Sequence, residues 1–111
     1  MSSPTQRTLK LLRAEGYTCQ VVEHFNVWSK VRQDLFHCID VLAIKPGEIL
    51  GVQATTDAHV SSRIEKSLAL PELKAWLEAG GKFQVWGWAL KGPRGRAKRW
   101  QVRRVDITEV P

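Results

Sequence analysis

Hydrophobic and polar positions alternate with a helical period at the start of the chain. Ser3 precedes Pro4, and Gln6 follows Ser3 by three positions, which is the pattern of a capping box with proline at the first helical position. Three leucines between residues 9 and 12 supply an apolar side, and Gly16 is typical of a C-terminal stop. The pattern predicts a helix over residues 4–15.

The next segments are rich in strand-forming residues. Residues 17–28 contain Tyr, Val, Phe and Trp between polar positions and predict a first strand, followed by SKVRQ as a polar connection. The sequence LFHCIDVLAIK, residues 35–45, predicts a second, mostly buried strand, and ILGVQAT, residues 49–55, predicts a third. Pro46 and Gly47 favour a turn between them, so these two strands should form a hairpin.

After Thr56 the hydrophobic period returns to that of a helix. Apolar residues recur at helical spacing from 60 to 77, and Pro71 divides them into two helices. Gly80 and Gly81 end the second helix.

The last third of the chain predicts two more strands. These are KFQVWGWALK, residues 82–91, and KRWQVRRVDI, residues 98–107, joined by a turn in GPRGRA. The order αβββααββ predicts an α/β (α+β) fold with a central mixed β-sheet flanked by helices. Because 111 residues suffice for one core, we expect a single domain over residues 1–111.

Composition excludes several classes of protein. The hydrophobic fraction is 43%, but no apolar run approaches the roughly 20 residues that cross a bilayer. The first ten residues lack the apolar core of a secretory signal, which favours a cytoplasmic location. Cys19 and Cys38 have no metal-ligand spacing and are expected to be buried free thiols, and His24, His37 and His59 also lack such a spacing.

Charge points to a polyanionic partner. The net charge is +6, and residues 94–104 contain six basic residues and no acidic one. The alternative is a solvated hairpin without a partner. Trp100 lies within this run and is the better candidate for base stacking, whereas Trp86 and Trp88 are more typical of core or interface packing. The predicted phosphate contacts are Arg94, Arg96, Lys98, Arg99, Arg103 and Arg104.

Asp40 is the residue that demands a chemical explanation. It falls in the middle of the predicted buried strand, where a carboxylate is costly unless it is paired, hydrogen-bonded or bound to a metal. Asp34 shares its face of the strand but would lie about 20 Å away if the strand were straight. Across the hairpin turn, Gln53 should lie near Asp40, and Thr55 projects to the same face as Gln53.

With these features the sequence resembles the PD-(D/E)-x-K nuclease superfamily, in its compact Holliday-junction-resolvase-like and phage-type branch. The resemblance covers about residues 4–90, and its specific part is IDVLAI, the Pro-Gly turn and LGVQAT. It implies a restriction-endonuclease-like core, metal-dependent hydrolysis of phosphodiester bonds in DNA, and a homodimer. A phage or mobile-element origin and RNA as substrate remain open on the same resemblance.

The resemblance assigns roles by position. Asp40 matches the metal-binding aspartate, Gln53 the second acidic position and Thr55 the lysine position, so two of three residues depart from the pattern. In some branches the lysine lies on the helix after the hairpin, where Lys66 and Arg63 stand here. The family's additional helix glutamate has Gln6, Glu15 and Glu23 as its nearest counterparts.

The expected cofactor is Mg²⁺ or Mn²⁺, because phosphodiester hydrolysis needs a hard cation that prefers oxygen ligands. Asp40 would be the anionic ligand, with the Gln53 amide and the Ala54 backbone carbonyl beside it. Glu23 or Asp34 is a candidate third ligand.

Three alternatives stay open at this stage. The chain could be a non-catalytic nucleic-acid-binding module that keeps the fold and the basic surface. It could be a homo-oligomeric interaction subunit whose Trp-rich fourth strand forms the interface. In the simplest case Asp40 pairs with an arginine, and Gln53 and Thr55 cap the strand end.

Overall fold

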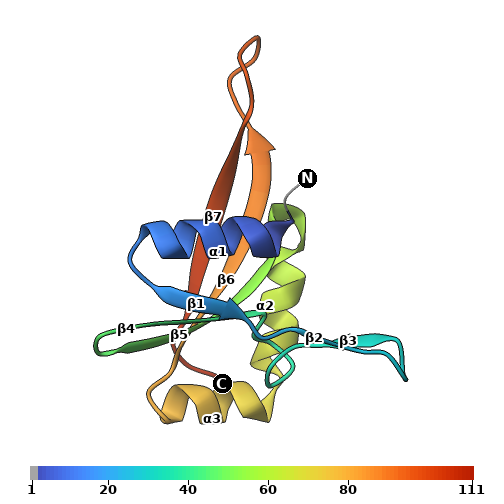
Figure 1. Ribbon diagram of the computed structural model, residues 1–111, viewed down its shortest axis with the longest axis vertical. Helices are drawn as coiled ribbons and strands as arrows, with labels where there is room; N and C mark the ends of the chain where they lie inside the picture. Colours follow the sequence, from blue (N-terminus) through green and yellow to red (C-terminus); the bar gives the residue numbers. More distant parts are fainter. Residues whose placement is uncertain (1–2) are drawn as a thin grey trace.

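A mixed five-stranded sheet forms the centre of the molecule in the computed structural model, which describes residues 3–111 (Figure 1). Its spatial order is β1-β4-β5-β6-β7, in which β5 and β6 run parallel and every other neighbouring pair is antiparallel. The strands are β1 (Thr18–Val21), β4 (Val41–Lys45), β5 (Glu48–Thr56), β6 (Lys82–Lys91) and β7 (Arg99–Ile107). The predicted mixed sheet and the β4–β5 hairpin are confirmed.

Helices cover the two faces of this sheet separately. Helix α1 (Pro4–Ala14) packs on one face, while α2 (Val60–Leu68) and α3 (Pro71–Glu78) pack on the other, after a short 3₁₀ turn, η1 (Asp57–His59) (Figure 1). Each helix therefore closes a core of its own, and the molecule has three layers. The expected helices on both sides of Pro71 are confirmed.

Strand β6 shows how the sequence produces two cores. Trp86 and Trp88 point toward α1, whereas Phe83 and Val85 point toward α2 and α3, as the two-residue period of a strand requires. The indole Nε1 of Trp88 donates a hydrogen bond to Thr8 Oγ1 on α1 at 2.9 Å. Because both tryptophans are buried within this chain, β6 does not offer them as the dimer interface that we considered from the sequence.

Two predictions about the N-terminal part were wrong. The expected first strand over residues 17–28 is broken after Val21, and its second half pairs with part of the expected polar connection. These pieces, β2 (His24–Asn26) and β3 (Val31–Gln33), form a separate two-stranded hairpin. The pairing arises from a turn held by Asn26, whose Oδ1 accepts hydrogen bonds from the backbone N–H of Trp28 and of Ser29.

The predicted strand over residues 35–45 was also wrong in its first half, because β4 begins only at Val41. Residues 35–39 form a tight loop closed by backbone bonds between Leu35 and Ile39, with Phe36 and His37 in the left-handed region. The loop lets the adjacent side chains of Cys38 and Ile39 enter the same core, which a straight strand would send to opposite faces. Asp40 thus lies immediately before β4 rather than in the middle of a strand.

The two cysteines match the predicted buried free thiols in part. Both cysteines are free; Cys38 is buried and Cys19 is half-buried, so only the former fits the predicted buried thiol fully. Burial raises the pKa of the Cys38 thiol to about 12, which keeps it protonated and unreactive.

Among residues 3–111, no helix has the length and apolar character needed to span a bilayer.

Gly87 should be essential to the packing of α2 on the sheet. A Cβ atom there would lie 2.2 Å from Val60 Cγ2 and 2.9 Å from the backbone Cα of Asp57. We expect Gly87→Ala to lower the free energy of unfolding by about 1–3 kcal/mol through overpacking, measured by urea denaturation. The double variant Gly87→Ala/Val60→Ala should destabilise by less than the sum of its two single substitutions, and an additive result would contradict this packing.

Candidate functional site

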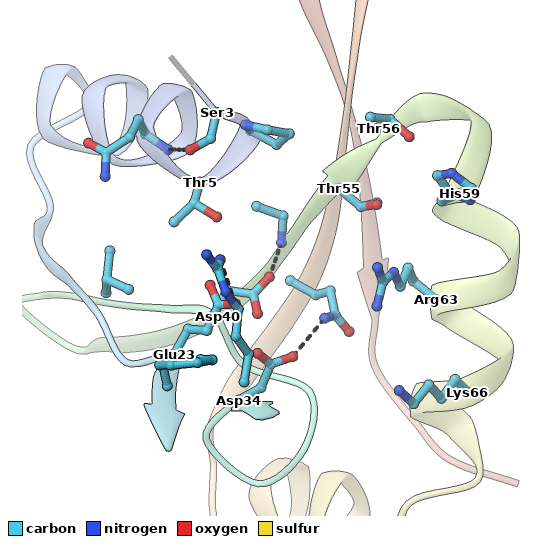
Figure 2. Close-up of a pocket in the computed structure, with 17 residues that line it drawn as sticks. Ser3, Thr5, Glu23, Asp34, Asp40, Thr55, Thr56, His59, Arg63 and Lys66 are labelled. Atoms are coloured by element: carbon cyan, nitrogen blue, oxygen red, sulfur yellow. Dashed lines mark hydrogen bonds and ion pairs between the residues drawn. The ribbon is translucent and has the colours of Figure 1, made fainter. Parts of the chain in front are cut away.

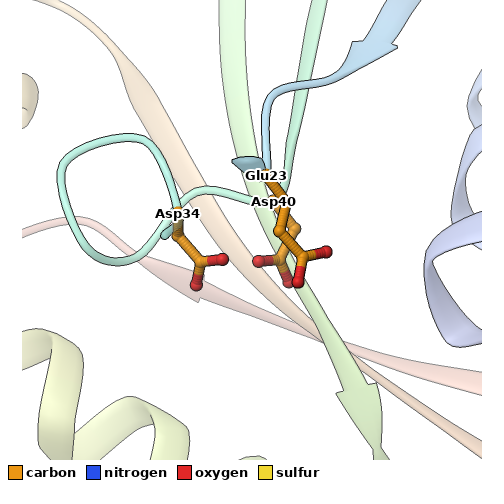
Figure 3. A group of neighbouring side chains, drawn as sticks. All are labelled: Glu23, Asp34 and Asp40. Carbon is orange, nitrogen blue, oxygen red and sulfur yellow. The ribbon is translucent and has the colours of Figure 1, made fainter. Parts of the chain in front are cut away.

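Three carboxyl groups converge on one point of the molecule. Glu23, Asp34 and Asp40 each offer an oxygen, and these oxygens lie within 4.8 Å of one another (Figure 3). The separation of about 20 Å between Asp34 and Asp40 assumed a straight strand, and the chain is bent between them. The loop over residues 35–39 doubles the chain back and brings the two aspartates together.

Long-range backbone pairing fixes the position of each acid. The Val22 N–H donates to the Asp40 carbonyl at 2.8 Å, and the Asp40 N–H donates to the Val52 carbonyl at 2.9 Å, so Asp40 is held between β1 and β5. Glu23 follows Val22 in the break between β1 and β2, not on the long first strand that we expected. Its carboxylate accepts a hydrogen bond from Arg32 Nη1 at 3.4 Å, across the β2–β3 hairpin.

Asp40 has the most unusual environment of the three. Its side chain is 5% exposed, and Oδ2 accepts a hydrogen bond from the Ala54 backbone N–H at 2.9 Å. Burial, together with the hydrogen bond and negative charge of Asp34, raises the pKa of Asp40 to about 8 despite the opposing effect of the Ala54 N–H. Near neutral pH, the Asp40 carboxyl group is therefore largely protonated when no cation is bound.

The Gln53 side chain forms a hydrogen bond with Asp34 and not with Asp40. Its Nε2 donates to Asp34 Oδ2 at 3.1 Å, and its Oε1 accepts a 3.5 Å hydrogen bond from Ser67 on α2. In this orientation Gln53 presents a donor to the acidic cluster, and its oxygen faces the helix. Thr55 is buried on the same side of β5 and lines the same cleft.

The acidic cluster lies in a cleft that also contains cationic groups. The cleft has a volume of about 790 Å³ and is bounded by the start of α1, the end of β5 and one side of α2. Arg63 and Lys66 extend from α2 toward it, as Figure 2 shows. Both residues were expected near the site from the sequence, and the fold brings them to the same cleft as Asp40. Other lining residues include Gln6, Phe25, Arg32, Ala54 and His59.

This donor set fits a hard divalent cation. In an octahedral Mg²⁺ or Mn²⁺ site with bonds of about 2.1 Å, opposite oxygens lie about 4.2 Å apart. The three carboxyl oxygens lie within 4.8 Å of one another, so small side-chain movements would bring them to bonding distance of one ion. Binding a cation would also remove the cost of keeping like charges together in a poorly solvated place. Glu23, Asp34 and Asp40 are therefore the residues that could hold the metal, with Gln53 supporting Asp34.

Residues of the basic run have diverse surroundings. Arg103 pairs with Asp57 at 2.9 Å, and Arg104 pairs with Glu15 and lies over the Trp86 ring. Glu15 is thus engaged at the far end of α1 and does not join the acidic cluster. The Trp100 ring is covered on one face by Arg7, with 3.4 Å between the guanidinium carbon and the ring centroid.

The tip of the β6–β7 hairpin is free of such contacts. Residues 92–98 are all exposed and extend beyond the sheet (Figure 1). Across residues 3–111, the ion pairs include none with Arg94, Arg96, Lys98 or Arg99. Within the described residues these four side chains have no carboxylate partner, whereas Arg103 and Arg104 each have one.

Two features of the site were missed from the sequence. The Ala54 N–H donates a hydrogen bond to Asp40, a contact that was not expected beside the role of the Ala54 carbonyl as a metal ligand. Arg32 lines the cleft because β2 and β3 pair, which the sequence pattern concealed. His59, which has no metal-ligand spacing in the sequence, also lines the cleft.

Comparisons with models of protein families, with curated proteins and with solved structures each found no match to this chain.

The raised pKa of Asp40 predicts a stability that depends on pH and metal. Since the folded-state value of about 8 exceeds the ordinary 3.8, the folded protein binds more protons between these values, and its free energy of unfolding falls as pH rises through this window. We expect the metal-free protein to unfold at a lower temperature at pH 8 than at pH 5, with a slope of at most about 1.4 kcal/mol per pH unit. Mn²⁺ or Mg²⁺ should restore stability at pH 8.

The control variants separate Asp40 from other acids. Asp40→Asn should remove most of the pH slope and the stabilisation by Mn²⁺, whereas Glu78→Gln, at an exposed position on α3, should leave both unchanged. Calorimetry with and without EDTA measures both quantities. An equal response of the wild type and Asp40→Asn to Mn²⁺ would exclude the acidic cluster as the metal site.

Proposed function

We propose that this protein is a metal-dependent nuclease that hydrolyses phosphodiester bonds in DNA. The observation that carries the proposal is the convergence of Glu23, Asp34 and Asp40 in a cleft that Arg63 and Lys66 enter from the opposite side. Carboxylates for a cation, next to fixed positive charges for a phosphate, are what phosphodiester hydrolysis requires.

Each side chain has a distinct role in this scheme. Glu23, Asp34 and Asp40 would hold the Mg²⁺ or Mn²⁺, which would supply Lewis-acid activation of a water and of the phosphate. Gln53 keeps the Asp34 carboxylate in place through its amide N–H, since a fixed ligand binds a metal more tightly than a mobile one. Deprotonated Asp40 is the form that binds the cation, so activity should rise with pH.

Lys66 and Arg63 lie where a phosphate would need positive charge. Thr55 occupies the position of the lysine in the PD-(D/E)-x-K pattern and provides none, and Lys66 is our candidate to replace it. Similarly, Asp34 and Glu23 provide the charge that Gln53 lacks at the second acidic position. The mixed sheet with helices on both faces is compatible with a restriction-endonuclease-like core, which we include in the proposal.

DNA is the proposed substrate because of the exposed basic hairpin tip. Arg94, Arg96, Lys98 and Arg99 can contact backbone phosphates, which positions a duplex without reading its sequence. We therefore propose selection of DNA by structure or by ends. A homodimer would place two such clefts on one duplex, and light scattering tests it.

A second candidate function is nucleic-acid binding without cleavage. It is favoured by Gln53 and Thr55, which stand where the resemblance calls for an acid and a lysine. Both functions predict salt-sensitive DNA binding, and only the first predicts products.

The cleavage assay uses branched, nicked, duplex and single-stranded DNA with Mg²⁺ or Mn²⁺. We expect cleavage of at least one substrate by the wild type, loss by about 100-fold or more in Asp40→Asn, and a similar loss in Lys66→Ala, because each removes charge stabilisation in the transition state. Lys74→Ala, an exposed lysine on α3, is the matched control for Lys66→Ala and should cut normally.

The outcomes distinguish the two candidates. Binding to DNA with no products under any metal supports the non-catalytic module. Equal cleavage by the wild type and Asp40→Asn would contradict the assignment of the active site. Products that appear equally in EDTA would contradict metal dependence.

A further inference from the structure

The β2–β3 hairpin extends away from the body of the molecule and carries exposed apolar side chains (Figure 1). Phe25, Val27, Trp28 and Val31 are each at least half exposed. An isolated two-stranded hairpin is marginally stable in water, and these side chains bury little surface within this chain. Their placement has no explanation in the folding of the protein.

Trp28 is the most exposed of these side chains, at 93%. Its backbone is nevertheless held in a defined turn: the N–H of Trp28 donates to Asn26 Oδ1 at 2.9 Å, and the N–H of Lys30 donates to the Asn26 carbonyl at 2.7 Å. Lys30 adopts a left-handed φ of 56°, which closes the turn. An ordered turn thus presents an indole ring to solvent.

The hairpin is also basic and adjoins the acidic cleft. Residues 24–33 include Lys30 and Arg32 and contain no acidic residue, and Arg32 pairs with Glu23 at the base of the hairpin. At the base of the hairpin, Phe25 and Arg32 form part of the cleft wall. The hairpin therefore continues one wall of the cleft outward, with aromatic and basic side chains interleaved.

We propose that this hairpin is a base-stacking arm that binds unpaired nucleotides of the DNA whose backbone occupies the cleft. Trp28 would stack on a base, and Lys30 would contact a neighbouring phosphate. Stacking on an aromatic ring tolerates every base because each has a π face, and the nearby cations suit a polyanion better than an apolar protein. The inference rests on the proposed function for the nature of the substrate.

The hairpin also indicates where the stacked base would lie. Phe25 lines the cleft, and Trp28 follows it by three positions, in the turn at the tip of the same hairpin. The preferred substrate is thus a junction between duplex and single strand, with its unpaired bases next to the cleft.

The test measures binding in the full-length Asp40→Asn background, which prevents cleavage. Fluorescence anisotropy compares a forked duplex that has unpaired arms with a blunt duplex of the same paired sequence. Trp28→Ala should weaken binding to the fork about tenfold and leave binding to the blunt duplex unchanged, whereas Trp28→Phe should keep most of the affinity. Val27→Ala, an exposed apolar neighbour, is the matched control and should bind the fork normally.

A second readout locates the contact. 2-Aminopurine is placed at successive unpaired positions of the fork. The Asp40→Asn protein should quench its fluorescence at one or two of these positions, and the double variant Asp40→Asn/Trp28→Ala should not. The unfolding temperature should be the same with and without Trp28→Ala, because the ring is not packed on the protein.

Several outcomes would overturn the arm. One is that Trp28→Ala weakens binding to the fork and to the blunt duplex equally. Another is that Trp28→Ala changes a dimer to a monomer in light scattering, which would make the hairpin a contact between copies. Trp28-dependent fork binding by a wild type that cuts no DNA would refute the proposed hydrolysis and leave the arm intact. Cleavage of DNA without any Trp28-dependent preference would refute the arm alone.

Discussion

The burial of the Asp40 carboxyl group beside Asp34 is the constraint on which the rest of the site depends. Two acids in a poorly solvated place repel each other and are costly to ionise, and the raised pKa of Asp40 expresses that cost. The Ala54 N–H offsets part of it, and Gln53 donates a hydrogen bond to Asp34. What remains is a group of oxygens that a divalent cation would stabilise.

The surrounding fold maintains this arrangement at some expense. The break after β1 places Glu23 at the cluster, and the loop before β4 uses left-handed backbone at Phe36 and His37, which are unfavourable positions for residues with side chains. Ile39 enters the core next to the sheet and fixes the loop. Strain in the loop is thus maintained by hydrophobic packing directly behind the acids.

Charge is distributed so that opposite signs meet at the cleft. Lys66 and Arg63 extend from α2 toward the cleft, and the end of β5 lines the cleft between them and the acids. Further from the cleft, Arg103 and Arg104 are paired with acids of the same chain, while the β6–β7 tip is not. Two projecting hairpins thus present basic side chains to solvent, and β2–β3 presents aromatic side chains beside them.

Much of the framework was predictable from local patterns. The cap at Ser3, the helices divided by Pro71, and the last two strands follow from residue spacing and turn chemistry, which act over a few positions. The cost of burying a carboxylate in an apolar run identified Asp40 as a site residue, and the hairpin turn placed Gln53 near it. Helix periodicity did not assign Lys66 and Arg63 to the cleft; the resemblance suggested them.

The sequence by itself therefore determined the succession of the main elements, their apolar faces and the need for a partner at Asp40. Only the tertiary structure decided what that partner is. Glu23 and Asp34 join Asp40 through a strand break and a loop whose backbone conformations are fixed by distant pairing, such as Val22 with Asp40, and not by their own residues. Local sequence carries little information on such pairing, because its free energy comes from contacts that exist only when the sheet has formed.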